Sequence, residues 1–195
     1  MRPADAGTRL IAAARATIDE ALGGPRFVLD REPWMLVVAA TFVTLRQGTE
    51  LRGCVGSILA RQPLIEDVRT NALGSAFRDP RFPPLARHEL PHTHIELAVL
   101  SEPEEVPAAT QEEAIAHVVP ERDGVILHMG PLRSVFLPQV WQDLPEPRDF
   151  FGHLKRKAGL SEDFWSPAMR VERFRTEKFV EEPSANPAKK RELLS

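Results

Sequence analysis

The segment most informative about the fold covers residues 36–59 and reads LVVAATFVTLRQGTELRGCVGSIL. It contains two apolar, β-branched runs, Leu36 to Arg46 and Glu50 to Leu59, separated by the short polar loop Gln47-Gly48-Thr49. A glycine in such a loop supplies the positive φ that a tight turn needs. The segment therefore predicts a β-hairpin.

Helical patterns lie on both sides of this hairpin. Asp5 to Leu22 places apolar residues at helical spacing and ends at Gly23-Gly24-Pro25, where a helix would stop. A second helix begins at Pro63, because proline is tolerated in a first turn whose N–H groups are unpaired, and ends near Asp79-Pro80. Thr93 to Leu100 then alternates apolar and polar residues, which predicts a half-buried strand.

The same order of elements returns in the second half of the chain. The pattern predicts, in sequence, strand Gly124 to Met129, turn Gly130-Pro131, strand Leu132 to Leu137, helices from Pro138 and from Pro147, and a strand from Met169 to Glu181. Hairpin, helix and strand thus occur twice, which indicates an α+β protein built from two related lobes, with a groove where they meet.

Shorter signals complete the predicted organisation. Thr110 followed by Glu113 forms a capping box that opens a short helix, and Pro103 to Pro107 is predicted to be a loop. We expect one domain over residues 1–181, with lobes of about 1–120 and 121–181. Residues 182–195, which contain the basic cluster Lys189-Lys190-Arg191, are expected to form a disordered tail.

Composition narrows the classes of function. With 25 basic and 28 acidic residues the formal charge is −3, so the chain lacks the electrostatic footprint for duplex DNA or an anionic membrane. The longest apolar run, Trp34 to Val43, is about half the length of a membrane span. A single cysteine fits a reducing compartment, and the first residues lack a secretory signal, so we expect a cytoplasmic protein.

The single thiol, Cys54, is the first candidate for chemistry. Side chains on a strand alternate faces, so Arg52, Cys54 and Gly56 are expected to share one face, with the Cα atoms of arginine and cysteine roughly 6.5–7 Å apart. The guanidinium would favour the thiolate and Gly56 would leave space beside the sulfur. The alternative is that Cys54 is a small buried hydrophobe and that the glycines mark a bulge.

A charged turn follows the second predicted helix at Phe77-Arg78-Asp79-Pro80-Arg81-Phe82. Asp79 could accept hydrogen bonds from Arg52 or Arg81 and so orient a guanidinium, which would make this turn a wall of the cysteine pocket. The alternative is a surface turn that Phe77 and Phe82 anchor and that contains its own ion pairs.

Metal and cofactor sites have weaker signals. His92, His94 and Glu96 are expected on one face of a strand, an arrangement that can bind zinc or iron, but the alternation is equally explained by a polar outer face and an apolar inner face. No phosphate loop, nucleophile elbow, zinc-protease pair or cluster of cysteines is present. We therefore predict no metal and no cofactor.

Four motifs together carry a resemblance to a known family. They are Leu51-Arg52-Gly53-Cys54-Val55-Gly56, Ala76-Phe77-Arg78-Asp79-Pro80-Arg81-Phe82-Pro83-Pro84-Leu85, Phe136-Leu137-Pro138-Gln139-Val140-Trp141 and Lys157-Ala158-Gly159-Leu160. From about Leu10 to Glu181 the chain resembles the AMMECR1 domain family, and most closely the bacterial branch called AmmeMemoRadiSam system protein A.

The resemblance implies a fold, and it implies partners. The fold is α+β, with duplicated strand–helix units that form a mixed, barrel-like sheet flanked by helices, and two lobes around a cleft near the six-residue motif. The partners are a Memo-like protein and a radical SAM protein, through genomic association, while the family's biochemical activity is undefined. Val55 stands where isoleucine is usual and Val135 where threonine is usual, and His92 and His94 match no family motif.

Two hypotheses for function follow. In the first, a cleft binds or modifies a small anionic molecule or a peptide segment, with Cys54, Arg52 and Asp79 as catalytic residues and Gly53, Val55, Gly56, Arg81 and Phe82 as ligand-binding residues. In the second, the chain is a non-catalytic accessory or scaffold protein that docks a Memo-like or radical SAM partner, and Cys54 is a packing residue.

Overall fold

The computed structural model describes residues 2–28 and 31–181, and these divide into two compact units. The first unit spans residues 1–99 together with 178–195, and the second spans residues 100–177. The lobes expected from the sequence had their boundary near residue 120. The expected tail, residues 182–195, lies outside the described residues.

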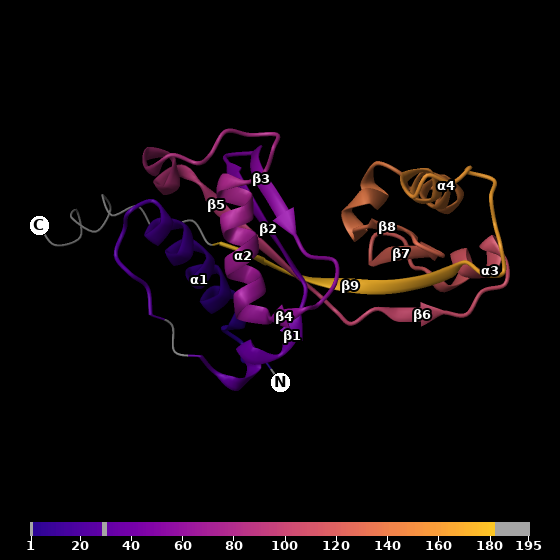
Figure 1. The fold of residues 1–195 in the computed structure, drawn as a ribbon, viewed down its shortest axis with the longest axis horizontal. Helices are drawn as coiled ribbons and strands as arrows, with labels where there is room; N and C mark the ends of the chain where they lie inside the picture. Colours follow the sequence, from indigo (N-terminus) through magenta and orange to yellow (C-terminus); the bar gives the residue numbers. More distant parts are fainter. Residues whose placement is uncertain (1, 29–30, 182–195) are drawn as a thin grey trace, which may run out of the picture. The chain divides into compact units, whose positions relative to one another are not determined.

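The first unit begins with a long helix and contains a three-stranded antiparallel ladder (Figure 1). Its elements, in chain order, are α1 (Ala6–Ala21), a 3₁₀ helix (Pro33–Leu36), β1 (Val38–Ala39), β2 (Thr41–Gln47), β3 (Glu50–Gly56), β4 (Gln62–Pro63), α2 (Leu64–Phe77), a 3₁₀ helix (Arg87–His92) and β5 (His94–Leu100). The expected first helix, hairpin, second helix and strand are therefore all confirmed, and Gly48 has the predicted positive φ of 60°.

In the ladder, β2 lies between β3 and β5 and pairs antiparallel with both. Its core face carries Val43 and Leu45, which are fully buried with Ile95 and Leu97 of β5. Helices α1 and α2 lie side by side and supply Leu10, Ile18 and Val68 to the same core. The apolar stripes read from the sequence thus meet in one cluster.

The first strand of the hairpin is shorter than predicted. Leu36 belongs to the 3₁₀ helix, and Val38–Ala39 forms a separate two-stranded sheet with Gln62–Pro63. Strand β2 begins at Thr41, because the N–H and hydroxyl of that residue both donate to the buried carboxylate of Asp67, at 2.8 and 2.7 Å. The strand therefore starts later than the apolar run from Leu36 had suggested.

The second unit repeats the arrangement of the first. Its elements are β6 (Glu104–Val106), α3 (Gln111–His117), β7 (Asp123–Met129), β8 (Leu132–Phe136), a 3₁₀ helix (Pro138–Gln142), α4 (Pro147–Lys157) and β9 (Arg170–Val180), the last residues of which belong to the first unit. Strand β7 lies between β8 and β9 and pairs antiparallel with both. The predicted repeat of hairpin, helix and strand is confirmed.

Aromatic side chains dominate the second core. Trp141 stacks on Phe150 with ring centroids 3.7 Å apart, and Phe136 meets the edge of the same ring at 5.2 Å. Val125 and Leu127 of β7 pack against this group from the sheet. One face of the β7–β8 hairpin is therefore buried under α4, and the opposite face carries Ile126 and His128.

One prediction from the sequence was wrong. Residues 103–107 were expected to form a loop, but Glu104–Val106 is strand β6, which pairs antiparallel with β9. Two adjacent glutamates between prolines hide the strand pattern, because only Val106 is buried and the pairing is made through the backbone. Glu104 also forms an ion pair with Arg173 across the two strands.

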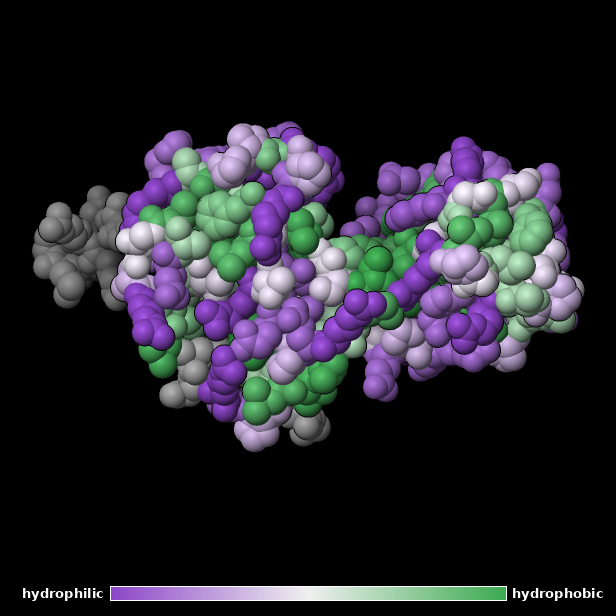
Figure 2. Space-filling view, viewed as in Figure 1, coloured by the Kyte–Doolittle hydropathy of each residue, from purple (hydrophilic) through white to green (hydrophobic). Residues whose placement is uncertain are grey.

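The α+β class is confirmed by this mixture of helices and antiparallel ladders. Figure 2 shows hydrophilic residues, in purple, distributed over the visible surface of both units. The most exposed large apolar side chains of the described chain include Val37, which precedes β1, and Val38, the first residue of β1. Among the described residues, every helix is too short or too polar to cross a membrane.

Candidate functional site

The register of β3 decides where Arg52 points. Leu45 of β2 pairs with Gly53 while the next residue, Arg46, pairs with Leu51. Arg52 is therefore an extra residue without a partner across the ladder, which is a β-bulge. A bulge breaks the alternation of side chains, so the expectation that Arg52 and Cys54 share one face fails at this point.

The guanidinium of Arg52 is almost buried and all three of its nitrogen atoms are bonded. Its Nε and Nη2 donate to the two carboxylate oxygens of Glu89 at 2.9 and 3.0 Å, and its Nη1 donates to the carbonyl of Pro83 at 2.9 Å. The hydrogen bonds from Arg52 lower the pKa of Glu89 to about 2, although burial opposes this shift. Arg52 thus ties β3 to residues 83–89 rather than to the thiol.

Glu89 was not among the residues predicted from the sequence. Its carboxylate also accepts a hydrogen bond from the N–H of Ala86 and another from Gln47. Glu89 lies in the polar stretch before β5 with no motif around it, and its partner is 37 residues away. No local signal could have identified it.

Cys54 is half-buried on the face of the ladder opposite the core. Its Sγ lies 3.2 Å from Oγ1 of Thr44, the residue directly across β2. Thr44 in turn pairs with Glu96 of β5, so the three residues form a row across the three strands. The backbone N–H of Cys54 donates to Oδ2 of Asp79 at 2.8 Å, which connects the strand to the charged turn.

Asp79 and Arg81 form the charged part of the site. The buried carboxylate of Asp79 accepts from Nε and Nη2 of Arg81 at 3.0 and 2.7 Å and from the backbone N–H of Arg81 at 3.1 Å. These bonds, the Arg81 guanidinium first among them, hold the pKa of Asp79 far below its ordinary value despite burial. Of the two arginines that the sequence offered to Asp79, the structure selects Arg81.

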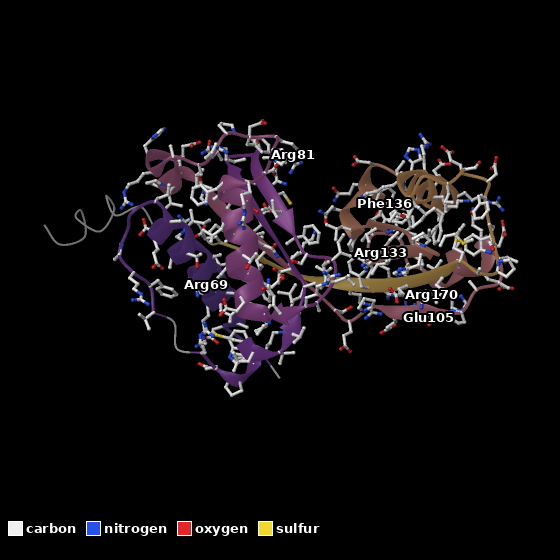
Figure 3. The ribbon with its side chains drawn as sticks, in the orientation of Figure 1. Arg69, Arg81, Glu105, Arg133, Phe136 and Arg170 are labelled. Carbon is white, nitrogen blue, oxygen red and sulfur yellow. The ribbon has the colours of Figure 1, made fainter. Side chains whose placement is uncertain are left out.

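Arg81 is also the cation beside the cysteine. Its Nη2 lies 3.3 Å from the carbonyl oxygen of Cys54, and its side chain is 55% exposed (labelled in Figure 3). Hydrogen bonding to Asp79 raises the pKa of Arg81, and the negative charge of Asp79 adds to this. The guanidinium also lies 5.5 Å from the ring centroid of Phe82.

The two glycines of the six-residue motif allow close contacts with other parts of the protein, not with a ligand. A Cβ on Gly53 would lie 2.1 Å from the carbonyl oxygen of Ser75, so glycine is needed where β3 crosses α2. The next residue but one, Val55, donates its N–H to the Ser75 hydroxyl at 2.9 Å. A Cβ on Gly56 would lie 2.2 Å from the ring of Phe42, so that ring fills the space expected beside the sulfur.

The three candidate metal ligands do not lie together on one strand. His92 ends a 3₁₀ helix, and only His94 and Glu96 lie on β5. The carboxylate of Glu96 pairs with Arg46 at 2.8 Å. Within residues 2–28 and 31–181, no group of three histidine, cysteine or acidic residues is close enough to hold a metal ion.

Comparisons with known proteins place this site in a family. The AMMECR1 family model matches residues 11–179. The chain belongs to the AMMECR1 family. Relatives include a protein of Thermofilum pendens, 34% identical with 91% of each chain covered, and Protein MJ0810 of Methanocaldococcus jannaschii, 33% identical with 90% of each chain covered.

A solved AMMECR1-like structure has the same fold. The crystal structure of the uncharacterized protein PH0010 from Pyrococcus horikoshii matches with a TM-score of 0.79 and 32% identity, covering 90% of this chain and 91% of that one. The shared fold is of the α+β class, with helices packed on antiparallel strands in each unit. The α+β fold of the family that the resemblance implied is confirmed.

The AMMECR1 motifs of the second unit have structural roles. Lys157 donates to the carbonyl of Val135 at 2.9 Å and lies 5.1 Å from the ring centroid of Phe136. Trp141 donates its indole N–H to the carbonyl of Asp123 at 2.8 Å. Val135, where the family usually has threonine, is buried opposite Ile126, so an apolar side chain suits this position.

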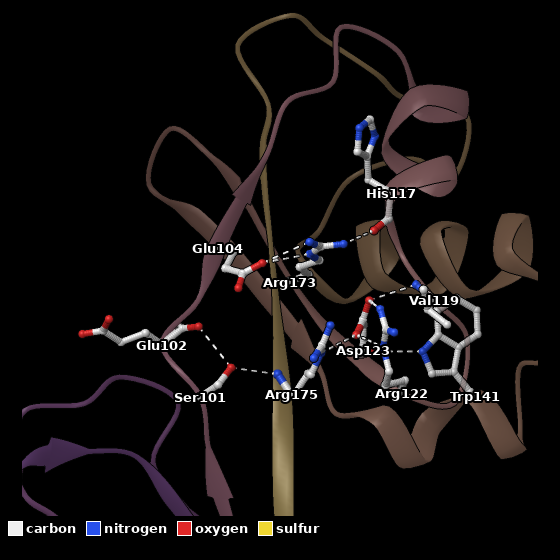
Figure 4. Close-up of polar contacts among 10 residues, drawn as sticks. All are labelled: Ser101, Glu102, Glu104, His117, Val119, Arg122, Asp123, Trp141, Arg173 and Arg175. Carbon is white, nitrogen blue, oxygen red and sulfur yellow. Dashed lines mark hydrogen bonds and ion pairs between the residues drawn. The ribbon is translucent and has the colours of Figure 1, made fainter. Parts of the chain in front are cut away.

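A pocket of about 130 Å³ in the second unit is held by ion pairs (Figure 4). The carboxylate of Asp123 is buried, accepts from Arg122 and from the N–H of Val119, and lies 3.7 Å from Arg175. Arg173 binds Glu104 with two nitrogen atoms. Because its charged side chains satisfy one another, we interpret this pocket as part of the fold.

Proposed function

We propose that this AMMECR1 protein binds an anionic group, of a small molecule or a peptide segment, at a site formed by Cys54 and Arg81. The observation that carries the proposal is an exposed guanidinium, fixed by a buried carboxylate, that donates to the backbone carbonyl of the residue carrying the single, half-buried thiol. Arg81 takes the cationic role that the sequence had assigned to Arg52, and Asp79 orients it.

The geometry of Arg81 supports anion binding. Asp79 occupies its Nε and Nη2, which fixes the plane of the guanidinium at little cost in side-chain entropy. Its Nη1 has no hydrogen-bond partner within the described part of the chain and remains available to a ligand oxygen.

The single cysteine makes this proposal directly testable. We compare alkylation of the native protein by neutral iodoacetamide and by anionic iodoacetate, followed by mass spectrometry. If Arg81 attracts anions to Cys54, the ratio of the iodoacetate rate to the iodoacetamide rate is expected to fall about fivefold in Arg81→Gln, the equivalent of one screened charge interaction. Arg81→Lys keeps the charge and is expected to retain most of the ratio.

Arg78→Gln is the matched control, because Arg78 is an exposed arginine on the same turn whose side chain bonds, within the described residues, only to the carbonyl of Thr70. It should leave the ratio unchanged. A native protein whose thiol does not react, or an equal ratio in the wild type and in Arg81→Gln, would contradict the proposal.

A second candidate function is docking of a Memo-like or a radical SAM protein in the cytoplasm. It is favoured because Arg52, Gly53 and Gly56 of the six-residue motif make contacts within the protein itself, so that these three residues stabilise the fold rather than contact a substrate. Co-purification of the chain with each partner tests it. Binding that survives both Cys54→Ala and Arg81→Gln would support docking without chemistry at the thiol.

A further inference from the structure

The second unit contains an arginine, Arg133, whose guanidinium has two nitrogen atoms without hydrogen-bond partners among the described residues. Two nitrogen atoms of Arg133 on β8, Nε and Nη2, are buried and have no hydrogen-bond partner. They are the only side-chain nitrogen or oxygen atoms in this state among the described residues. Because arginine does not lose its proton in proteins, the charge on this edge persists. Leaving it desolvated and unpaired is costly.

These two atoms form one functional edge. The N–H groups on Nε and Nη2 point in parallel and match the two oxygens of a carboxylate or of a phosphate. The first unit shows such an edge when it is filled, because Nε and Nη2 of Arg52 bind the two oxygens of Glu89 at 2.9 and 3.0 Å. Within the described residues, Arg133 has no equivalent of Glu89.

The neighbours of Arg133 on the same face of the sheet are a histidine and a second arginine. Arg133 pairs in register with His128 of β7, and His128 pairs with Arg170 of β9, so the three basic side chains form a row across three strands. Arg170 is exposed and has no ion pair among the described residues. Arg133 and Arg170 are labelled in Figure 3.

Two acidic residues lie in the adjoining row. Glu172 of β9 pairs with Ile126 and with Glu105 of β6. Oε2 of Glu172 lies 2.9 Å from Nε2 of His128. This carboxylate therefore binds the imidazole and does not bind the guanidinium of Arg133. Six side chains therefore share this face of the sheet with Arg133. They are the basic pair His128 and Arg170, the acidic pair Glu105 and Glu172, and the apolar pair Ile126 and Val135.

We propose that this face of the second unit binds an oxyanion, the carboxylate or phosphate group of a small molecule, through the Nε–Nη2 edge of Arg133, with His128 and Arg170 beside it. The edge is closed to water in the free protein, so binding requires Arg133 to change rotamer, a fast motion for a side chain on a hairpin. The bound group then satisfies a charge that is otherwise unpaired. This site is independent of the proposal for Cys54.

Nuclear magnetic resonance of the full chain tests the proposal. The Nε–H resonance of Arg133, identified by its loss in Arg133→Lys, is followed while inorganic phosphate or acetate is added at constant ionic strength. A saturable shift with either anion, absent with chloride, is expected. The anion that binds more tightly identifies the ligand chemistry as phosphate or carboxylate.

The variant Arg133→Lys keeps the positive charge but lacks the paired edge. It is expected to bind the preferred anion about tenfold more weakly, measured from the backbone resonances of β7 and β8, which corresponds to one lost charge-assisted hydrogen bond. Arg148→Lys, on α4 at the opposite face, is the control and should bind like the wild type.

Shifts that rise linearly with phosphate and acetate, as with chloride, would overturn the proposal, and so would equal affinity in Arg133→Lys. The dispersion of the amide spectrum shows in the same experiment that the variant is folded. Alkylation of Cys54 is unaffected by these variants, so a failure here is distinguishable from a failure of the function proposed for the first unit.

Discussion

The two hairpins of the molecule share a topology but use their arginines differently. In each unit the first strand of the hairpin lies between the second strand and a later one. On β3, the guanidinium of Arg52 is bonded at every nitrogen atom, whereas on β8 that of Arg133 lacks partners at two. The comparison indicates that Arg52 is part of the fold, whereas the role of Arg133 is the oxyanion binding proposed above.

The contact between hairpin and helix differs in a similar way. In the first unit, Ser75 of α2 donates its hydroxyl to the carbonyl of Val43, and its own carbonyl approaches Gly53 closely. In the second unit the serine is on the strand, where Ser134 donates to the carbonyl of Leu154 of α4 at 2.7 Å. Only the first contact requires a glycine, which explains a glycine-rich motif in one repeat alone.

The largest expected effect tests the structural arginine. Replacing Arg52 by methionine removes the cation that pairs with the carboxylate of Glu89 and the donor to the carbonyl of Pro83, in a nearly buried place. We expect the free energy of unfolding to fall by about 3 kcal/mol, as for other broken buried ion pairs, in urea denaturation. Arg46→Met, which breaks the more exposed pair with Glu96, is the control and should cost below about 1 kcal/mol. Equal losses in the two variants would mean that Arg52 has no special structural role.

The next largest effect concerns the close approach of β3 to α2. Gly53→Ala places a methyl group against the carbonyl oxygen of Ser75, a backbone atom that cannot rotate away. We expect a loss of about 2 kcal/mol in stability, measured by thermal unfolding. Gly56→Ala meets only the ring of Phe42, so the double variant Gly56→Ala with Phe42→Leu should recover much of its loss. Phe42→Leu should not restore the stability of Gly53→Ala. If it did, the carbonyl of Ser75 would not be the atom that the new methyl group meets.

The acid dependence of stability sharpens the role of Glu89. Its pKa is lowered from 4.5 to about 2 in the folded protein by Arg52, so its contribution is present above pH 4.5 and is lost as the pH falls toward 2. Glu89→Gln should cost about 2 kcal/mol at pH 6, since a charge-assisted hydrogen bond is lost. The difference from the wild type should shrink between pH 4.5 and 2.5 in urea titrations. A difference that stays constant over this range would show that the carboxylate charge contributes nothing.

The elements of the fold were predictable because their signals are local. The helical spacing before Gly23, the glycine of the hairpin loop and the alternation after Thr93 all depend on residues next to one another in the sequence. Strand β6 was not predictable, because its short pairing with β9 is made by backbone atoms under exposed glutamates. Local patterns thus predict elements that bury their own side chains.

The candidate site was predictable only in part. Asp79 and Arg81 are two residues apart, and their interaction was one of the two pairings of Asp79 that the sequence left open. The bulge at Arg52 depends on the register with β2 and removes that side chain from the face of Cys54. Arg133 was not predicted, because a lone arginine after a turn usually lies in solvent, and its buried, unpaired edge depends on the fold around it.

The smallest expected change gives the sharpest test of the comparison. Arg133→Met removes a desolvated guanidinium edge that makes no hydrogen bond in the free protein and leaves an apolar chain beside Val135 and Ile126. Replacing such a charge by a hydrophobe of similar length should leave the free energy of unfolding unchanged or raise it by up to about 1 kcal/mol, in contrast to Arg52→Met. Urea denaturation without added phosphate or carboxylate measures this. A gain in stability with a loss of anion binding would mean that the second unit keeps Arg133 at the expense of its own stability, which is common for residues that serve a ligand. A loss of more than about 1 kcal/mol would instead give Arg133 a structural role like that of Arg52, and the contrast between the two hairpins would not hold.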